Sequence, residues 1–216
     1  MTEADRPDPE FSTARRTRSR RGEGDRLREE ILEATEALLV ETGDAERVSI
    51  RAVADAVGVT PPSIYLHFAD KAELLLTVGE GRFAEFDALL QQAATSVDDP
   101  MQALRQKGRA YVHFGVEHPE HYRILFMVRG AGDRTLDEMP AAAAAFGHLV
   151  DDVQRCMDAG VFAAGDATLV AVGLWTNMHG LTSLLICAPA FPWPEIDVII
   201  DHVIDVAARG LAPLLA

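Results

Sequence analysis

The histidines in the middle of the chain are the residues whose spacing first suggests chemistry. His113, His118 and His121 fall within nine residues, and imidazole nitrogens are common zinc ligands. The gaps of five and three residues flank Pro119, where we expect one helix to end and another to begin. Neither an i, i+4 histidine pair nor a nearby set of cysteines and carboxylates accompanies them. We therefore predict no metal site and no cofactor.

Hydrolytic chemistry has no clearer signal. Serine, histidine and aspartate are all present, so composition alone leaves a catalytic triad open. However, the chain contains no Gly-x-Ser-x-Gly sequence, which would place a serine on a sharp turn between strand and helix. We expect a protein that is not an enzyme and that has no catalytic residues.

Arginines are concentrated near the N-terminus of an otherwise acidic chain. The whole sequence has 20 Lys and Arg against 34 Asp and Glu, a formal charge of −14. Residues 11–28 contain seven arginines and two acidic residues, whereas residues 69–216 contain ten basic and twenty acidic residues. Local charge governs how a segment meets a polyanion. Residues 1–24 therefore form either a solvated tail or a flexible basic arm that binds nucleic acid.

A second pattern lies in residues 49–68, SIRAVADAVGVTPPSIYLHF. Ala54 is small where two short helices would cross, and Gly58 can adopt the left-handed backbone of a turn between them. Ile64 lies at the next buried position, and we expect the second helix to reach Phe68. This spacing is typical of a helix-turn-helix, whose second helix enters the major groove. Taken alone, it also fits an ordinary helix pair in an all-α domain.

The surrounding residues resemble the tetracycline-repressor (TetR) family of transcriptional regulators. The resemblance covers about residues 26–76, and residues 64–75, IYLHFADKAELL, are similar to the most recognisable signature of that family. It implies three DNA-binding helices followed by about six helices for ligand binding and dimerisation. It also implies that Tyr65, His67 and Lys71 contact the sugar-phosphate backbone.

The start of each DNA-binding helix supplies further candidate contacts. Residues at the start of the second helix can hold phosphate, and those at the start of the third can meet base edges. We expect Phe68 to pack in the core instead, and the arm to enter the minor groove or follow the backbone. The predicted DNA contacts are Ser49, Arg51, Thr60, Pro61, Ser63, Tyr65, His67 and Lys71, with Arg18, Arg20 and Arg21 in the arm.

Aromatic and sulfur side chains gather in the second part of the chain, where a ligand pocket is expected. Trp175 and His179 are four residues apart and share one helix face, and residues 175–180 resemble a Trp…His-Gly subgroup of TetR regulatory domains. Family pockets are largely apolar with a few polar anchors, for which we favour Asn177 and His179. The same aromatic residues would also suit an ordinary core. The predicted ligand-binding residues are Phe83, Phe86, Tyr111, Phe114, Tyr122, Phe126, Trp175, Asn177, Met178 and His179.

The elements that must position these residues are all helical. Apolar residues recur at helical spacing, and no period-two pattern predicts a strand. We therefore predict an all-α fold with a three-helix DNA-binding head at residues 25–70 and a larger ligand-binding and dimerisation domain at residues 71–216. The expected helices lie at about residues 25–43, 49–58, 60–68, 71–94, 100–117, 119–128, 138–159, 166–187 and 194–212.

The last two expected helices have broad apolar faces. The TetR resemblance implies a two-fold dimer through them, and two-fold symmetry predicts a palindromic operator. No apolar run reaches the ~18–20 residues of a membrane span, and the N-terminus lacks the apolar core of a secretory signal. We expect a cytoplasmic, reduced protein without membrane contact whose two cysteines are small buried side chains.

The predicted function is ligand-responsive transcriptional regulation. The simplest form is a repressor that a small, largely apolar molecule releases from a palindromic operator. Two alternatives remain open from the sequence: an activator on the same scaffold, and a helical protein that sequesters small molecules and carries a vestigial DNA-binding head.

Overall fold

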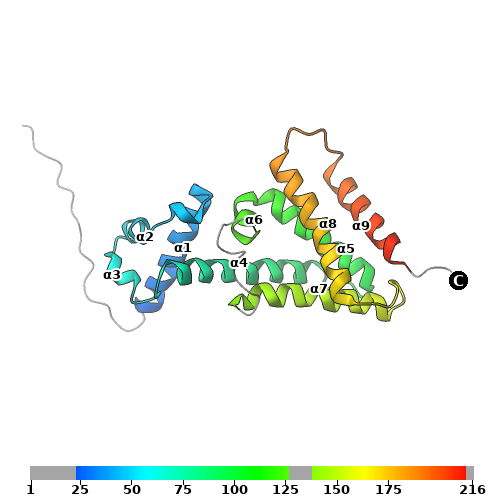
Figure 1. The fold of residues 1–216 in the computed structure, drawn as a ribbon, viewed down its shortest axis with the longest axis horizontal. Helices are drawn as coiled ribbons and strands as arrows, with labels where there is room; N and C mark the ends of the chain where they lie inside the picture. The colour runs from blue at the N-terminus through cyan, green and yellow to red at the C-terminus, as the bar shows by residue number, and fades with distance from the viewer. Residues whose placement is uncertain (1–22, 127–137, 213–216) are drawn as a thin grey trace, which may run out of the picture.

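The computed structural model describes residues 23–126 and 138–212, and all the regular secondary structure in these two ranges is helical (Figure 1). The predicted all-α class is therefore confirmed for the described residues. The arginines of the predicted arm, Arg18, Arg20 and Arg21, lie outside them. The elements are α1 (Glu23–Thr42), the 3₁₀ helix η1 (Ala45–Arg47), α2 (Ile50–Val57), α3 (Pro61–Ile64), α4 (Lys71–Ala93), α5 (Pro100–Glu117), α6 (Pro119–Phe126), α7 (Pro140–Asp158), α8 (Ala167–Cys187) and α9 (Ile196–Leu211).

The molecule is elongated, with a head made of α1–α3 at one end and a body made of α5–α9 at the other (Figure 1). The long helix α4 begins in the head and continues through the body, where it packs against α5 and α7. α6 is short and touches α1, α4 and α5. Head and body are therefore joined through α4 and α6.

Local capping residues begin α2 and α4 and end α2 as predicted. The Ser49 hydroxyl accepts a hydrogen bond from the N–H of Ala52 at the start of α2. Gly58 ends α2 with a left-handed φ of +76°. A carboxylate oxygen of Asp70 accepts from the N–H of Glu73 at 2.8 Å and begins α4. The two N-caps, Ser49 and Asp70, each accept from a backbone N–H that the first turn of a helix leaves free.

The second helix of the helix-turn-helix motif, here called the reading helix, is α3, and it is shorter than predicted. α3 ends at Ile64 rather than at Phe68. The chain then continues in a tighter turn, in which the N–H of His67 donates to the Ile64 carbonyl at 2.9 Å and the N–H of Phe68 donates to the same oxygen at 3.1 Å. The first of these bonds spans three residues and the second four, a combination typical of a helix end, and the Phe68 ring lies in the core at 1% exposure. Tyr65 consequently lies on this turn and not within a regular helix.

Two boundaries of the head also differ from expectation. α1 begins at Glu23, so the last two residues of the segment expected to be a flexible arm are helical. The 3₁₀ helix η1 was not predicted. It begins after Asp44, whose carboxylate accepts from the N–H of Glu46 at 2.9 Å.

The buried core of the head includes a side chain from the body. Its members come from α1–α4 and the intervening turns, and Ile124 of α6 joins them at 6% exposure. The neighbouring α6 residues Tyr122 and Leu125 belong to the core of the body instead. A single short helix therefore contributes to both cores. The head core consists of Ile31, Leu39, Ala45, Val48, Val53, Ala54, Ile64, Phe68, Leu74, Val78 and Ile124.

Ion pairs attach α9 to α5 at the end of the body. Arg105 lies 2.5 Å from a carboxylate oxygen of Asp205, and Arg109 pairs with Asp201. The hydrogen bond from Arg109 holds the pKa of Asp201 below its ordinary value.

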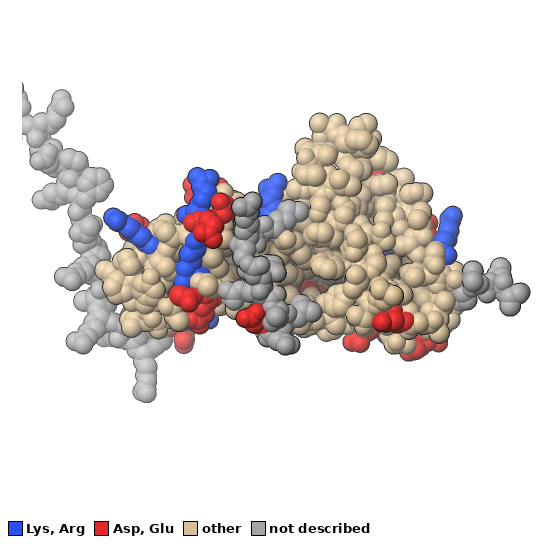
Figure 2. Space-filling model, in the orientation of Figure 1, with Lys and Arg blue, Asp and Glu red and all other residues tan. Residues whose placement is uncertain are grey.

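The α8 helix is apolar on a surface that the single chain leaves uncovered. By length and composition it is long and apolar enough to span a membrane, yet only 17% of that stretch is buried in this chain. Figure 2 shows few charged atoms over α8, in contrast to the head. At its end Cys187 is exposed, whereas Cys156 of α7 is buried. The expectation that both cysteines are buried is therefore wrong for Cys187.

Candidate DNA-binding surface and ligand cavity

The turn between α2 and α3 is fixed by burial on one side only. Val53, Ala54 and Ile64 are each fully buried, and the N–H of Val59 donates to the carbonyl of Ala54 at 2.9 Å across the turn. Gly58 supplies the left-handed backbone that other residues rarely adopt. The opposite side of the two helices is left free to face a partner.

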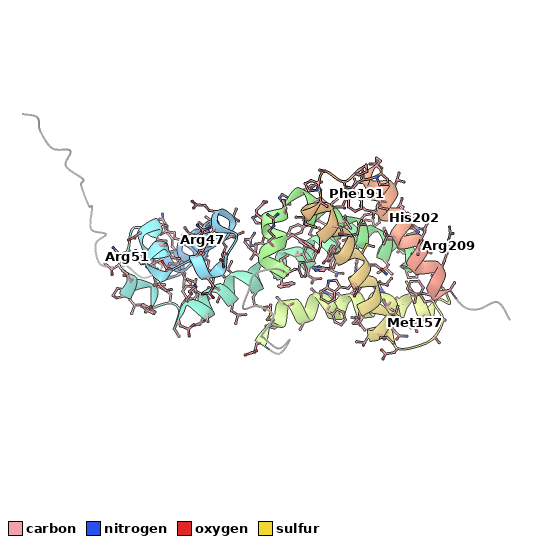
Figure 3. The ribbon with its side chains drawn as sticks, turned by 45° about the horizontal axis from the view of Figure 1, so that its top comes forward. Arg47, Arg51, Met157, Phe191, His202 and Arg209 are labelled. Atoms are coloured by element: carbon pink, nitrogen blue, oxygen red, sulfur yellow. The ribbon has the colours of Figure 1, made fainter. Side chains whose placement is uncertain are left out.

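Most of the predicted DNA-contacting side chains lie on this free side. Ser49, Arg51 and Thr60 are exposed, and Pro61 and Ser63 are partly exposed. The Arg51 side chain is 86% exposed and extends from the end of the head (Figure 3). The hydroxyls of Thr60 and Ser63 lie 3.2 Å apart at the start of α3, so each still has hydrogen-bonding capacity for another group.

The signature residues after α3 take different positions. Tyr65 is 54% exposed and His67 is partly exposed. The Lys71 ammonium donates to the carbonyl of Glu46 at 3.4 Å, which ties the start of α4 to η1. Sequence reasoning missed Leu66, which is 83% exposed. An apolar side chain this exposed beside the reading helix suits contact with a thymine methyl group or a sugar, and its i+2 position after buried Ile64 was the signal.

A cavity of ≈ 450 Å³ lies in the body between α4, α5, α7, α8 and α9, with Phe126 at the end of α6 also in its wall. Its walls are almost entirely aromatic and aliphatic, which is typical of a site for a small apolar molecule. Among the predicted ligand-binding residues, those that line it are Phe83, Phe86, Tyr111, Phe126, Trp175, Asn177 and Met178. The predicted residues Phe114, Tyr122 and His179 are not among its lining.

These three residues support the cavity wall from behind. Phe114 packs its ring against that of Phe86 with centroids 4.9 Å apart. The Tyr122 hydroxyl lies 2.6 Å from Nδ1 of His179, and the Tyr111 hydroxyl lies 3.1 Å from the same nitrogen. His179, proposed from the sequence as a ligand anchor, therefore holds Tyr111, which lines the cavity, and Tyr122, which lies behind it.

Burial fixes the protonation states of this polar group. It raises the pKa values of Tyr111 and Tyr122, so both phenols stay protonated. It lowers the pKa of His179, so the imidazole is neutral and can accept at Nδ1. The indole N–H of Trp175 donates to the Tyr111 oxygen at 3.3 Å. A row of hydrogen bonds thus runs from the cavity wall to the interior of the body.

Sequence reasoning also missed a charged group at the far wall. The Lys107 ammonium lies 2.7 Å from a carboxylate oxygen of Asp152 and 2.7 Å from the side-chain oxygen of Gln91. All three residues line the cavity, and Lys107 and Asp152 are 8% and 2% exposed. These residues are 16 and 45 positions apart in the sequence, so no local pattern brings them together.

Comparison with known proteins agrees with this architecture. Residues 31–78 match the family model of bacterial regulatory proteins of the TetR family, and residues 104–207 match that of the tetracyclin repressor-like C-terminal domain. The chain belongs to the TetR family. The predicted family is thereby confirmed.

Relatives of this TetR-family chain include an activator and a repressor of transcription. It is 29% identical over 102 residues to the transcriptional activator FasR of Mycolicibacterium smegmatis, 47% of this chain and 46% of that protein. It is 33% identical over 93 residues to the transcriptional repressor BepR of Brucella suis, 43% of each. The chain thus spans less than half of the length of these curated relatives. A solved structure of a protein of unknown function from Rhodococcus sp. RHA1 has a TM-score of 0.75 and 25% identity, and the match covers 87% of this chain and 96% of that one.

Of the three histidines considered for metal binding, the fold places His113 apart from the other two. Nε2 of His113 lies 2.7 Å from a carboxylate oxygen of Asp197 on α9. His118, Glu120 and His121 do come together at the start of α6, with ligand atoms within 4.8 Å of one another. The carboxylate of Glu120 is a partner that the sequence argument did not count.

The joint between head and body lies beside these residues. Nε2 of His121 is 3.4 Å from a carboxylate oxygen of Glu36 on α1, and Arg82 of α4 lies 3.2 Å from the other oxygen. Ile124 enters the head core, while Phe126, two residues later on α6, lines the cavity. In this TetR-family protein, α4 and α6 therefore each contribute residues both to the core of the head and to the wall of the cavity.

Proposed function

We propose that this TetR-family protein is a ligand-responsive transcriptional repressor that a small, largely apolar molecule releases from a palindromic operator. The observation that carries the proposal is the path of α4. Leu74 and Val78 of this helix pack in the head core, and Phe83 and Phe86 line the cavity about one and a half to two turns further along. A displacement of the cavity wall therefore acts on α4, the same helix that packs in the core of the head.

The proposed DNA contacts divide by role. Contacts to the sugar-phosphate backbone come from Tyr65, His67, Lys71, Ser49 and Arg51, because these residues have hydrogen-bond donors and are exposed or partly exposed. The hydroxyls and ring at the start of α3, on Thr60, Pro61 and Ser63, meet the base edges. Arginines 18, 20 and 21 of the arm add contacts in the minor groove or along the backbone. This chemistry requires the compartment that holds the DNA, so we assign the protein to the cytoplasm.

The proposed dimer forms through α8 and α9. Leu169, Val172 and Leu184 of α8 and Val198 and Val206 of α9 are exposed large apolar side chains, of which Leu169 is 70% exposed. A monomer rarely leaves a contiguous apolar surface of this kind uncovered. A two-fold axis through these helices covers it with the same surface of a second copy and places two heads on one DNA duplex.

Release follows from the geometry of two linked heads. The two reading helices must lie about 34–36 Å apart to enter successive major grooves. A ligand that pushes the α4 and α6 walls apart changes the angle of each head and thus this spacing. It does so only to the extent that it binds the released arrangement more tightly than the DNA-bound one.

An activator is the second candidate, and one observation favours it. FasR is named as an activator, while BepR is named as a repressor. The repressor and the activator would use the same DNA-binding head and the same dimer. Mapping the operator separates them, because a repressor site overlaps the promoter and an activator site lies upstream of it.

Selection of random double-stranded DNA on the purified protein at two salt concentrations tests DNA recognition. We expect enrichment of a palindrome whose half-sites lie about one helical turn apart. The double variant Tyr65→Ala, Lys71→Ala removes two phosphate contacts and should abolish retention, whereas Arg123→Ala, an exposed charge of the body, should not. Lack of enrichment from a folded, ligand-free dimer would support the vestigial head.

Substitution in the cavity tests ligand response. Trp175 lies partly at the surface, at 39% exposure, so its truncation should leave the fold and DNA binding intact. We expect Trp175→Ala to change the concentration of effector that releases DNA. Loss of folding in this variant would show that the residue serves the core instead.

The dimer is tested by a charge on α9. Val198 is 60% exposed on the proposed interface, and Val198→Glu should convert the dimer to a monomer in sedimentation velocity and remove palindrome binding. Ala144→Glu, on the exposed part of α7, is the matched control and should stay dimeric. A dimer that survives Val198→Glu would place the interface elsewhere.

A further inference from the structure

The Lys107 ammonium is the least expected feature of the cavity. A buried lysine is rare unless it is paired, and here the pair is complete, with Asp152 at 2.7 Å and Gln91 at 2.7 Å. Arg155 also bonds to the second oxygen of Asp152. The group therefore does not need a ligand to be stable. It is placed on the wall of an otherwise apolar cavity.

An ammonium group has three N–H donors. Within the described residues, two of those of Lys107 have protein acceptors, the carboxylate of Asp152 and the amide oxygen of Gln91. The third is left for a group inside the cavity. A hydrogen bond from a charged donor is stronger than one from a neutral donor. Shielding from water inside the cavity strengthens it further.

The opposite wall offers no comparable donor. The indole N–H of Trp175 already donates to Tyr111, and the hydroxyls of Tyr111 and Tyr122 lie within 3.2 Å of each other and of Nδ1 of His179. Their protons are used within the wall. Asn177 also lines the cavity, but it is exposed to solvent, whereas Lys107 is buried.

Asp152 balances the charge of Lys107 inside the cavity wall, whereas the side chain of Arg155, which bonds to the other oxygen of Asp152, is 58% exposed and screened by water. A ligand carboxylate at the third N–H would stand beside the carboxylate of Asp152, around one ammonium group. Two carboxylates in a shared buried site repel strongly, and moving the ligand charge out of water adds a further cost. An uncharged acceptor meets neither penalty.

We propose that the effector is an uncharged, largely apolar molecule whose single hydrogen-bond acceptor, a ketone, ester or ether oxygen, binds the free N–H of Lys107. This inference rests on the proposed function only in assigning the bound molecule the role of effector. The binding site itself stands on the contacts of Lys107 and the lining of the cavity.

Three probes of similar size test the ligand class: benzylacetone carries a ketone, phenylbutyrate a carboxylate and butylbenzene no polar group. Binding is read from the fluorescence of Trp175, which lines the cavity. The chain has one other tryptophan, Trp193, and a Trp193→Phe background removes its signal. No DNA is needed for this measurement.

The decisive variant replaces the whole ion pair, Lys107→Met with Asp152→Leu. Exchanging a buried pair for apolar side chains is often neutral for stability, whereas removing one partner leaves a buried charge. We expect the double variant to weaken benzylacetone binding about tenfold, the worth of one hydrogen bond to a charged donor. Butylbenzene binding should change less than about twofold, since the apolar contacts remain. Arg105→Met, on the same helix but paired with Asp201 and Asp205 outside the cavity, is the control and should change neither.

The outcomes separate this inference from the proposed function. Equal losses for benzylacetone and butylbenzene, tighter binding of phenylbutyrate than of benzylacetone to the natural chain, or no binding of benzylacetone would each overturn the assigned ligand class while leaving DNA binding untouched. The expected pattern without release of DNA would support the Lys107 site and count against the proposed repressor mechanism.

Discussion

Gly115 of α5 lies where three helices meet, and a single methyl group there should destabilise the body. A Cβ atom on Gly115 would lie 2.9 Å from a ring carbon of Tyr122 and still closer to the methyl carbon of Thr182. Real Cβ atoms essentially never come within 3.0 Å of another heavy atom, and ordinary contact begins at 3.4 Å. The Tyr122 ring must therefore retreat by about 0.5 Å and the Thr182 methyl by more, distances that close-packed interiors resist.

Neither neighbour can retreat freely. Thr182 and Tyr122 are fully buried. The Thr182 hydroxyl donates to the carbonyl of Met178 at 2.8 Å, which fixes its rotamer, and the Tyr122 hydroxyl is held 2.6 Å from His179. Overpacking of this kind costs about 3 kcal/mol at its upper range. The better helix propensity of alanine offsets about 1 kcal/mol, so the net loss is ~2 kcal/mol.

Thermal unfolding followed by circular dichroism at fixed protein concentration measures this loss. For a chain of this size we expect Gly115→Ala to lower Tm by about 4–8 °C. Gly147→Ala is the matched control, because a Cβ there meets nothing within 4 Å in the middle of α7. That variant should raise Tm by a few degrees through helix propensity alone.

A second-site change tests the assigned cause. Thr182→Ser removes the clashing methyl group but keeps the hydroxyl that bonds to Met178. Added to Gly115→Ala, it should restore much of the lost stability. An unchanged or raised Tm for Gly115→Ala, or no recovery in the double variant, would refute the close approach of α5, α6 and α8.

Three further outcomes follow from the structure. Burial lowers the pKa of His179, so below the ordinary histidine pKa the unfolded chain binds more protons than the folded one. Tm should therefore fall as the pH drops through that range, and it should fall less in His179→Gln. Equal pH profiles of the two proteins would contradict this. Burial raises the pKa of Cys156 to about 11, so iodoacetamide should label Cys187 quickly and Cys156 only after unfolding, as peptide mass spectrometry would reveal. Deletion of residues 1–22 should weaken DNA binding and reduce its salt dependence in titrations; an unchanged slope would exclude a DNA-binding arm.

The helices were largely predictable because their boundaries depend on neighbouring residues. An N-cap such as Ser49 or Asp70 bonds to the backbone two or three residues ahead, and the left-handed turn at Gly58 needs only that residue. The end of α3 was less predictable. It depends on how Phe68 reaches a core assembled from distant helices, and no local pattern encodes that path.

The cavity was predictable in kind but not in detail. Aromatic residues at helical spacing predicted an apolar site, and Phe86, Tyr111 and Trp175 do line it. Whether a side chain lies at the lining or behind it depends on rotations of whole helices, so His179 could not be distinguished from Trp175 by spacing. The pairing of Lys107 with Asp152 depends on the packing of α5 against α7, which sequence alone does not reveal.

In the proposed mechanism, ligand binding and DNA release are separable because different contacts govern them. Lys107 and the aromatic walls hold the molecule in the cavity. We infer that release also requires displacement of Phe126 on α6, since that helix carries Ile124 into the head core and His121 to Glu36. An eight-residue helix has little internal freedom, so displacement at its end moves these contacts together. Tight binding that leaves Phe126 in place gives no difference in affinity between the two states and therefore no release.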